Sequence, residues 1–353
     1  MERAVYRIID ANFNRAREAL RVIEEFCRFA LNSNLLTSRA KELRHRLCGI
    51  ACKIDNGKLI AGRDTANDVG IGLSVAGQMQ RADLGDSAKA AGKRLTEALR
   101  CLSETIAVIN PSAAGEIETL RYEAYNLEKD FLIFGSTIAK YKKVKLYIVI
   151  SSSLPAEVLR LTQQCIAGGA DCIQLRAKSI DDDLLFNLAV EFMQACRAGG
   201  VISIINDRVD VAAAAGADGV HLGQNDLPVE QAYRLQLSPL IIGKSTHSME
   251  QLKAACGLAG GGLTYAALGP VFATPTKPTA PPVGLGYVSD GVRLLADTGI
   301  GHVAIGGITI DNVEQVLRAG ARTIAVSSIA AKAANPKEVC RQLKEKIVSV
   351  SDE

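Results

Sequence analysis

The segment VISIINDRVDVAAAAGADGVHLG, residues 201–223, decides the fold class of this chain. It begins and ends with short apolar runs rich in Val and Ile, and the alanine-rich part between them is helical in pattern. Near-continuous apolar strands that alternate with helices are typical of parallel strands buried on both faces, because helices cover each side of such a sheet. The segment therefore predicts a strand, a helix and a second, parallel strand.

The same unit recurs from residue 145 onward. Eight short apolar runs are each followed by a helical stretch: KLYIVIS, CIQLRAK, VISIIND, GVHLG, LIIGKST, YAALGPV, HVAIGGI and TIAVSSI. Eight such units in roughly 200 residues are the number that closes a (β/α)8 TIM barrel, an α/β fold. A doubly wound open sheet is the alternative, although no GxGxxG motif follows the first run.

Before residue 145 the apolar spacing is different. From residue 10 to about 135, apolar residues recur three and four positions apart, which is the pattern of amphipathic helices. Glycine and a cluster of lysines in GSTIAKYKKVK, residues 135–145, interrupt this periodicity. We therefore expect an all-α helical bundle domain at residues 1–138, followed by a TIM-barrel domain at residues 139–353.

Composition excludes several classes of partner. The 353 residues carry a net charge of +3 and no basic tract with interleaved aromatic residues, so we expect no nucleic acid partner. No apolar run approaches the roughly 20 residues that span a bilayer, and the charged N-terminus lacks a signal-peptide core, which predicts a cytoplasmic protein without membrane association. Nine scattered cysteines are interpreted as reduced thiols. Small-molecule substrates are the expected partners, and a homo-oligomer is left open.

Polar residues gather where the predicted barrel strands end. In a barrel the loops after the strands converge over one mouth, so residues at these positions meet whatever their separation in sequence. The candidates at this mouth are Gln174, Arg176, Lys178, Asn206, Asp207, Asp226, Ser245, Thr274, Thr276, Lys277, Gly306, Gly307, Ser327 and Ser328. A purely structural barrel has no reason to gather cations and acids at its mouth, so the combination predicts a binding site.

These candidates divide by chemistry. Arg176, Lys178 and Lys277 are cations suited to phosphate oxygens. The paired glycines and paired serines follow the last two strands, where barrels commonly bind phosphate through backbone N–H groups. Asp207 and Asp226 supply hard oxygen ligands for a hydrated Mg²⁺, which typically binds through one or two carboxylates plus substrate phosphates. We therefore expect a diphosphate substrate with magnesium.

Each candidate also has a purely structural interpretation. Asp207 is suited to cap the helix that follows it, the glycines to a tight turn, and the serines to the next helix N-terminus. Thr274 and Thr276 would stiffen a proline-rich loop. His221, inside the apolar run GVHLG, is interpreted as a packed or supporting histidine rather than a base.

Five motifs occur in the order found in thiamine-phosphate synthases: QLRAK, INDRVDVAAAAGADGVHLGQNDLP, GKSTHS, GPVFATPTK and AIGGIT. Through them, residues 145–348 resemble this family of transferases of thiamine biosynthesis. The resemblance implies that 4-amino-5-hydroxymethyl-2-methylpyrimidine diphosphate condenses with a thiazole phosphate, or its carboxylated form, to give thiamine phosphate and diphosphate. Two positions depart from the family pattern. Ala177 stands where an acid is frequent, and Lys244 replaces a small apolar residue and faces either the diphosphate or the helical layer.

The resemblance also implies which residues bind which group. The pyrimidine diphosphate would be held by Gln174, Leu175, Arg176, Ala177, Lys178, Asn206, Ser245 and Lys277, the Mg²⁺ by Asp207 and Asp226, and the thiazole phosphate by Thr274, Pro275, Thr276, one of Gly306 and Gly307, Ser327 and Ser328. The catalytic set would be Arg176, Lys178, Lys277 and Ser245. Diphosphate would leave first, and the thiazole nitrogen would then attack the resonance-stabilised pyrimidine cation, so no side-chain nucleophile is needed.

The N-terminal segment RIIDANFNRAREALRVIEEFCRF resembles an extension fused to some bacterial members of the family. That resemblance implies a pyrimidine monophosphate kinase activity, although no P-loop is present. Two other functions are compatible with the barrel: a thiazole tautomerase of the same fold, and a non-catalytic sensor of a phosphorylated precursor. A magnesium requirement would exclude the first, and turnover of both precursors would exclude the second.

Overall fold

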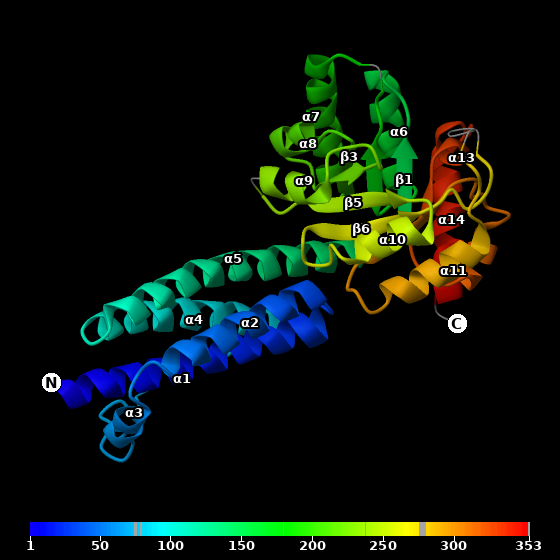
Figure 1. The fold of residues 1–353 in the computed structure, drawn as a ribbon. Helices are drawn as coiled ribbons and strands as arrows, with labels where there is room; N and C mark the ends of the chain where they lie inside the picture. The colour runs from blue at the N-terminus through cyan, green and yellow to red at the C-terminus, as the bar shows by residue number, and fades with distance from the viewer. Residues whose placement is uncertain (74–75, 78–79, 179, 237, 275–279, 352–353) are drawn as a thin grey trace. The chain divides into compact units, whose positions relative to one another are not determined.

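The computed structural model describes residues 1–73, 76–77, 80–178, 180–236, 238–274 and 280–351 (Figure 1). The chain forms two compact units, Met1–Gly135 and Ser136–Glu353. The first unit is helical and the second contains every strand of the described residues. Within these described ranges, no helix combines the length and the apolar character needed to cross a bilayer.

The first unit consists of helices, of which the long ones run side by side (Figure 1). They are α1 (Glu2–Glu25), the π-helix η1 (Phe26–Ala30), α2 (Asn34–Ala51), the short α3 (Asn56–Gly62), α4 (Leu84–Ala107) and the first part of α5 (Pro111–Tyr141). Ser33, Asp55 and Asp83 cap α2, α3 and α4, because each side chain accepts a hydrogen bond from a backbone N–H of the first turn. The predicted helical bundle is confirmed.

Helix α5 continues past Gly135, where the segment of the expected interruption begins. Phe134, Thr137 and Tyr141 are buried at 2%, 4% and 2% exposure, so the three-and-four spacing persists beyond Gly135. A single helical glycine costs only about 1 kcal/mol, which this continued burial offsets. The sequence predicted an interruption within residues 135–145, and the helix ends inside this segment, at Tyr141 rather than at Gly135.

The second unit is a closed barrel of eight parallel strands in the order of the sequence, which excludes the open-sheet alternative. The strands are β1 (Leu146–Ile150), β2 (Cys172–Leu175), β3 (Ile202–Asn206), β4 (Gly219–Leu222), β5 (Ile241–Thr246), β6 (Leu263–Leu268), β7 (Gly301–Ile305) and β8 (Ile324–Val326). The helices around it are α6 (Pro155–Ala167), α7 (Asp182–Ala198), α8 (Val209–Ala215), α9 (Val229–Leu235), α10 (Met249–Cys256), α11 (Gly284–Leu295), α12 (Val313–Arg318), α13 (Ser328–Ala331) and α14 (Pro336–Ser351).

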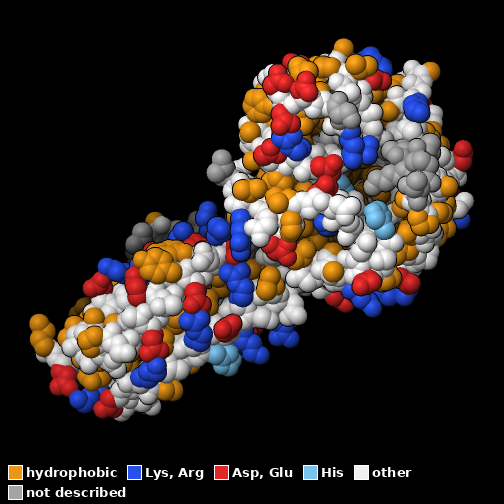
Figure 2. Space-filling model, turned by 45° about the horizontal axis from the view of Figure 1, so that its top comes forward, with side chains coloured by type: hydrophobic (Ala, Val, Ile, Leu, Met, Phe, Trp, Pro, Cys, Tyr) orange, Lys and Arg blue, Asp and Glu red, His pale blue; other side chains and the backbone are white. Residues whose placement is uncertain are grey.

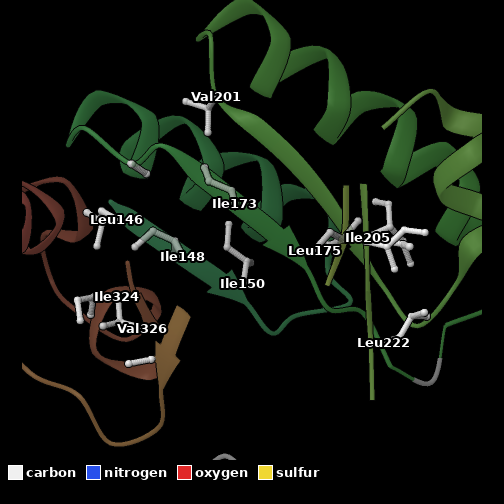
Figure 3. Packing of buried hydrophobic residues seen from close by; sticks show 14 of the residues in the cluster. Leu146, Ile148, Ile150, Ile173, Leu175, Val201, Ile205, Leu222, Ile324 and Val326 are labelled. Carbon is white, nitrogen blue, oxygen red and sulfur yellow. The ribbon is translucent and has the colours of Figure 1, made fainter. Parts of the chain in front are cut away.

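Alternate strand residues form two separate cores, because successive side chains of a strand point to opposite faces. Outward residues such as Leu146, Ile148 and Ile150 of β1 pack with Ile173 and Ile205 beneath the helices (Figure 3). Inward residues fill the barrel interior and include Tyr147, Val149, Ile204, Tyr265 and Val303. The inward residues at the carboxyl ends of the strands are therefore the ones that meet a ligand at the barrel mouth.

Candidate active site

A cavity of about 810 Å³ opens at the carboxyl ends of the barrel strands. Figure 2 shows a hollow in the face of the barrel, with acidic, basic and histidine side chains around it. The predicted residues that line the cavity are Gln174, Arg176, Lys178, Asn206, Asp207, Asp226, Ser245, Thr274, Gly306, Gly307, Ser327 and Ser328. Residues spread over much of the barrel sequence are thus brought to one site.

Other predicted residues do not line this cavity or lie outside the described residues. The Leu175 side chain is 1% exposed in the outer core, and Ala177 packs against that core, so neither side chain lines the cavity. Pro275, Thr276 and Lys277 fall in the undescribed range 275–279.

Asp207 and Asp226 lie together at one side of the cavity and are called the acid pair below. Asp207 follows β3 with a backbone φ of 63°, a left-handed conformation that is uncommon outside glycine and is tolerated by Asp and Asn. Burial, and then the hydrogen bond and negative charge of Asp226, raise the pKa of Asp207 to about 6. Two carboxyl groups that interact this directly are close enough to bind one cation together.

Asp226 is held by the backbone of its own loop. The N–H of Gly223 donates to Oδ2 of Asp226 at 2.6 Å. Burial alone would raise the pKa of this carboxyl, but the hydrogen bonds from Asp207 and Gly223 and the charges of Lys178 and Lys244 hold it below its usual value. Asp226 is therefore the member of the pair that loses its proton first as the pH rises.

Basic side chains approach the pair from two directions. Nζ of Lys178 lies 3.7 Å from Oδ2 of Asp207, and Arg176 also lowers the pKa of that carboxyl by its charge. Lys244 is on the outer face of β5 and outside the cavity, where Nζ donates to the carbonyl of Gly223 at 2.7 Å. The structure thus places Lys244 in the helical layer, as a brace on the loop that carries Asp226.

The opposite side of the cavity is lined by backbone. Gly306 and Gly307 have φ of 104° and 65°, and a Cβ at either position would lie 2.4 Å from Pro270 or 2.6 Å from the carbonyl of Ala273. No side chain fits there, so the backbone itself faces the cavity. Ser327 donates its hydroxyl to the carbonyl of Val149 at 2.8 Å, so this proton is already engaged, whereas Ser328 lines the cavity beside it.

The cavity floor contains residues that the sequence patterns did not identify. Tyr147 is one of them; His221 also lines the cavity, and its hydrogen bond to Ser245 agrees with the supporting role that the sequence predicted. Tyr147 lies on an inward position of β1, but every residue of β1 is buried, so alternation along the strand gives no signal for it. Thr309 and Lys332 also line the cavity, and only their place after the last two strands distinguishes them in the sequence.

The acid pair fits a magnesium ion better than a transition metal. Within the described residues, no group of three His, Cys, Asp or Glu side chains is placed to hold a metal ion. Mg²⁺ does not need such a group, because it usually retains several waters and binds through one or two carboxylates plus substrate phosphates. The charge of Asp226 helps to raise the pKa of Asp207, so a cation bound between the two carboxylates would relieve their repulsion.

The fold and the site define an enzyme of the (β/α)8 class whose mouth is suited to phosphorylated substrates. Residues 146–330 match the family model described as "Thiamine monophosphate synthase", and residues 7–130 match the model described as "ThiD2 family". Since the first match spans more than half of the chain, the chain belongs to the thiamine-phosphate synthase family. It is an enzyme of thiamine biosynthesis that condenses two precursors to thiamine phosphate.

Relatives of known name support this assignment over nearly the whole chain. The chain is 37% identical over 343 residues to the thiamine-phosphate synthase of Nostoc sp., covering 97% of this chain and 94% of that protein. It is 39% identical over 333 residues to the enzyme of Rhodopirellula baltica, covering 92% and 88%. The solved thiamine phosphate pyrophosphorylase of Pyrococcus furiosus covers 60% of this chain and 98% of its own, with a TM-score of 0.53 and 31% identity.

Proposed function

We propose that the acid pair and the nearby cations form the diphosphate site for the pyrimidine substrate. The contact between the carboxyl groups of Asp207 and Asp226, with Lys178 3.7 Å from Asp207, is the observation that carries this proposal. Asp207 and Asp226 would hold Mg²⁺, and the ion would neutralise charge on the diphosphate. Arg176 and Lys178 would bind the diphosphate oxygens, and Lys277 is proposed on its sequence motif alone.

The chain's own residues would then assist departure of the diphosphate. Arg176, Lys178 and Lys277 would stabilise the negative charge that develops on the leaving group. Gln174, Asn206 and Ser245 would orient the pyrimidine, with the backbone of Leu175 and Ala177 completing that side. No side-chain nucleophile takes part, because the electron-rich aminopyrimidine delocalises the cation that remains.

The thiazole phosphate would bind across the cavity from the acid pair. The backbone at Gly306 and Gly307 lies open to an anion, and Ser328 lines the same wall. Thr274 lines the cavity at the start of the proline-rich loop, and Pro275 and Thr276 are proposed on their motif. With the two phosphorylated groups at opposite walls, the thiazole nitrogen would face the pyrimidine carbon that loses the diphosphate.

The test is a purified full chain incubated with both precursors, with and without Mg²⁺. We expect thiamine phosphate and diphosphate in equal amounts, with product formation abolished by a chelator and restored by Mg²⁺. Product formation that does not depend on a divalent ion would overturn the assignment of the acid pair. It would also fit a metal-independent proton transfer of the tautomerase type.

We further propose that residues 1–138 and 139–353 are separate domains and that the second carries the synthase reaction. Family matches that end at residue 130 and begin at residue 146 support this division. For residues 1–138 the proposal is a pyrimidine monophosphate kinase. The full chain supplied with ATP, thiazole phosphate and the pyrimidine monophosphate, in place of the diphosphate, would then form thiamine phosphate. Absence of product under these conditions, with normal turnover of the diphosphate, would exclude the kinase activity.

A further inference from the structure

A chain of hydrogen bonds runs through the barrel beneath the cavity floor. Nε2 of Gln174 lies 2.7 Å from the hydroxyl of Tyr147, and this hydroxyl lies 2.9 Å from that of Tyr265. The Tyr265 hydroxyl is 3.0 Å from Nδ1 of His221, and Nε2 of His221 is 2.9 Å from Oγ of Ser245. Four of the five side chains line the cavity, whereas Tyr265 is fully buried below it.

The chemistry of the first donor fixes the direction of the chain. The amide nitrogen of Gln174 only donates, so Tyr147 accepts with its oxygen and must donate its own proton elsewhere. The Tyr265 oxygen is the acceptor at hydrogen-bond distance, and a phenol oxygen accepts far better than the nearby thiol of Cys172. Tyr265 in turn donates to Nδ1 of His221, which leaves the imidazole proton on Nε2.

We infer that Tyr265 is a positioning residue that holds His221 as its Nε2–H tautomer and thereby makes Ser245 a hydrogen-bond donor into the cavity. Nε2–H donates to the Ser245 oxygen, so the serine proton is directed away from His221 and toward the bound ligand. With the opposite tautomer, Ser245 would donate to His221 and offer the ligand only an oxygen. The buried hydroxyl of Tyr265 thus determines whether Ser245 offers a ligand a hydrogen-bond donor or an acceptor.

The packing around Tyr265 keeps its hydroxyl in place. Its ring stacks on that of Tyr141, with centroids 4.3 Å apart and planes 2° from parallel. Gly243 makes room for the ring, because a Cβ there would lie 2.1 Å from a ring carbon of Tyr265. Tyr141 lies as deep as Tyr265, but among the described residues its hydroxyl has no hydrogen-bond partner. The two tyrosines therefore differ in the role of the hydroxyl and not in burial.

The inference deepens the proposed function and rests on it, because it concerns what Ser245 offers to the first substrate. A serine that donates selects an acceptor atom, either a diphosphate oxygen or an unprotonated ring nitrogen of the pyrimidine. A ligand group that can only donate at this point would leave the serine proton unpaired in a buried site, which is unfavourable. The tautomer of His221 thus contributes to substrate selection.

The first test measures the tautomer directly. The full-length protein is labelled with ¹⁵N-histidine, and the His221 signals are assigned by their loss in His221→Gln. At pH 7.5 we expect a neutral ring protonated at Nε2 in the wild type and in Tyr141→Phe, and a ring shifted toward the Nδ1–H form in Tyr265→Phe. A wild-type ring protonated at Nδ1 would overturn the inference, whatever the enzyme activity.

The second test asks whether Tyr265 acts through Ser245. Tyr265→Phe should raise KM for the pyrimidine diphosphate about tenfold, the effect of one lost hydrogen bond, and Tyr141→Phe should leave KM unchanged. In a Ser245→Ala background, Tyr265→Phe should have no further effect. An equal effect in both backgrounds would mean that Tyr265 serves only packing and would overturn the inference. Absence of thiamine phosphate formation by the wild type would instead contradict the proposed function and leave the tautomer measurement intact.

Discussion

The ammonium group of Lys178 lies 3.7 Å from a carboxylate oxygen of Asp207, so the ends of two neighbouring barrel strands share one charged site. Lys178 is 58% exposed at its side chain and Asp207 is 31% exposed, which makes the pair a weak ion pair that a ligand can separate. When Mg²⁺ takes the carboxylate, Lys178 is free to turn to a phosphate oxygen. The Lys178–Asp207 ion pair is therefore suited to binding a ligand rather than to stabilising the fold.

Replacing Asp207 by Asn should raise the stability of the protein and lower its turnover. Asn removes the repulsion with Asp226 and is well tolerated at a positive φ, so with a chelator present the melting temperature should rise by about 2–4 °C. Turnover should fall by about 100-fold or more, because one metal ligand is lost. Asp210→Asn, at an exposed position paired with Arg208, is the control and should keep full turnover. A less stable Asp207→Asn variant would contradict the described acid pair.

Lys244→Met should weaken magnesium binding without changing the cavity lining. The lysine braces the carbonyl of Gly223, whose N–H holds Asp226, and loss of such a supporting contact typically costs about tenfold in metal affinity. The measurement is Mn²⁺ binding in the presence of diphosphate, followed by electron paramagnetic resonance and compared with half-saturation by Mg²⁺ in turnover. Lys253→Met, at an exposed position, is the control and should bind the ion as the wild type does. Wild-type ion affinity in Lys244→Met would show that Lys244 does not support the loop that carries Asp226.

His302 should make the barrel less stable in mild acid. Burial, and then the charges of Arg322 and Lys145, lower the pKa of His302 to about 4, and its Nε2 accepts from the N–H of Arg322 at 2.9 Å. The unfolded chain takes up this proton near its usual pKa of about 6.5, so the contribution of His302 is present above pH 6.5 and is lost as the pH falls toward 4.

His302→Gln retains an acceptor but does not titrate, which makes it a matched comparison for the pH effect. Between pH 7.5 and pH 5, urea unfolding of the wild type should lose about 1–2 kcal/mol more stability than that of the variant. Equal losses for the two proteins would show that the histidine is not held neutral.

Two glycine substitutions in the barrel should have opposite effects. Gly243→Ala places a methyl group 2.1 Å from the Tyr265 ring, so it should destabilise the protein by about 2 kcal/mol or more. Gly286→Ala in α11 meets nothing within 4 Å and should stabilise the protein by up to about 1 kcal/mol. Thermal unfolding of both variants is the measurement, and a neutral Gly243→Ala would mean that Tyr265 is not packed as described.

Much of the fold was predictable from the sequence because its signals are periodic. The eight apolar runs of the sequence form the eight strands of the barrel. Residues that follow these strands line one cavity, because the loops after the strands of a barrel meet at its mouth. The end of α5 was not predictable from Gly135. Burial of Thr137 and Tyr141 outweighs the low helix propensity of glycine, and only the folded structure shows that burial.

The cavity floor was less predictable than its rim. Tyr147, His221 and Tyr265 lie inside apolar runs, where residues facing the interior and residues facing the helices are equally apolar, so the sequence does not show which side chains meet. The role of Lys244 depends on the same choice between two faces. The register of β4 and β5, with Leu222 opposite Lys244, places it outside the barrel.

We propose above all that Asp207 and Asp226 bind one divalent ion together with the diphosphate of the substrate. The most direct measurement is a crystal structure of the full chain with Mn²⁺ and diphosphate, in which anomalous scattering locates the ion. We expect one ion in contact with both carboxylates and with diphosphate oxygens, and Arg176 and Lys178 on the remaining oxygens. An ion bound elsewhere, or diphosphate bound away from this acid pair, would contradict it.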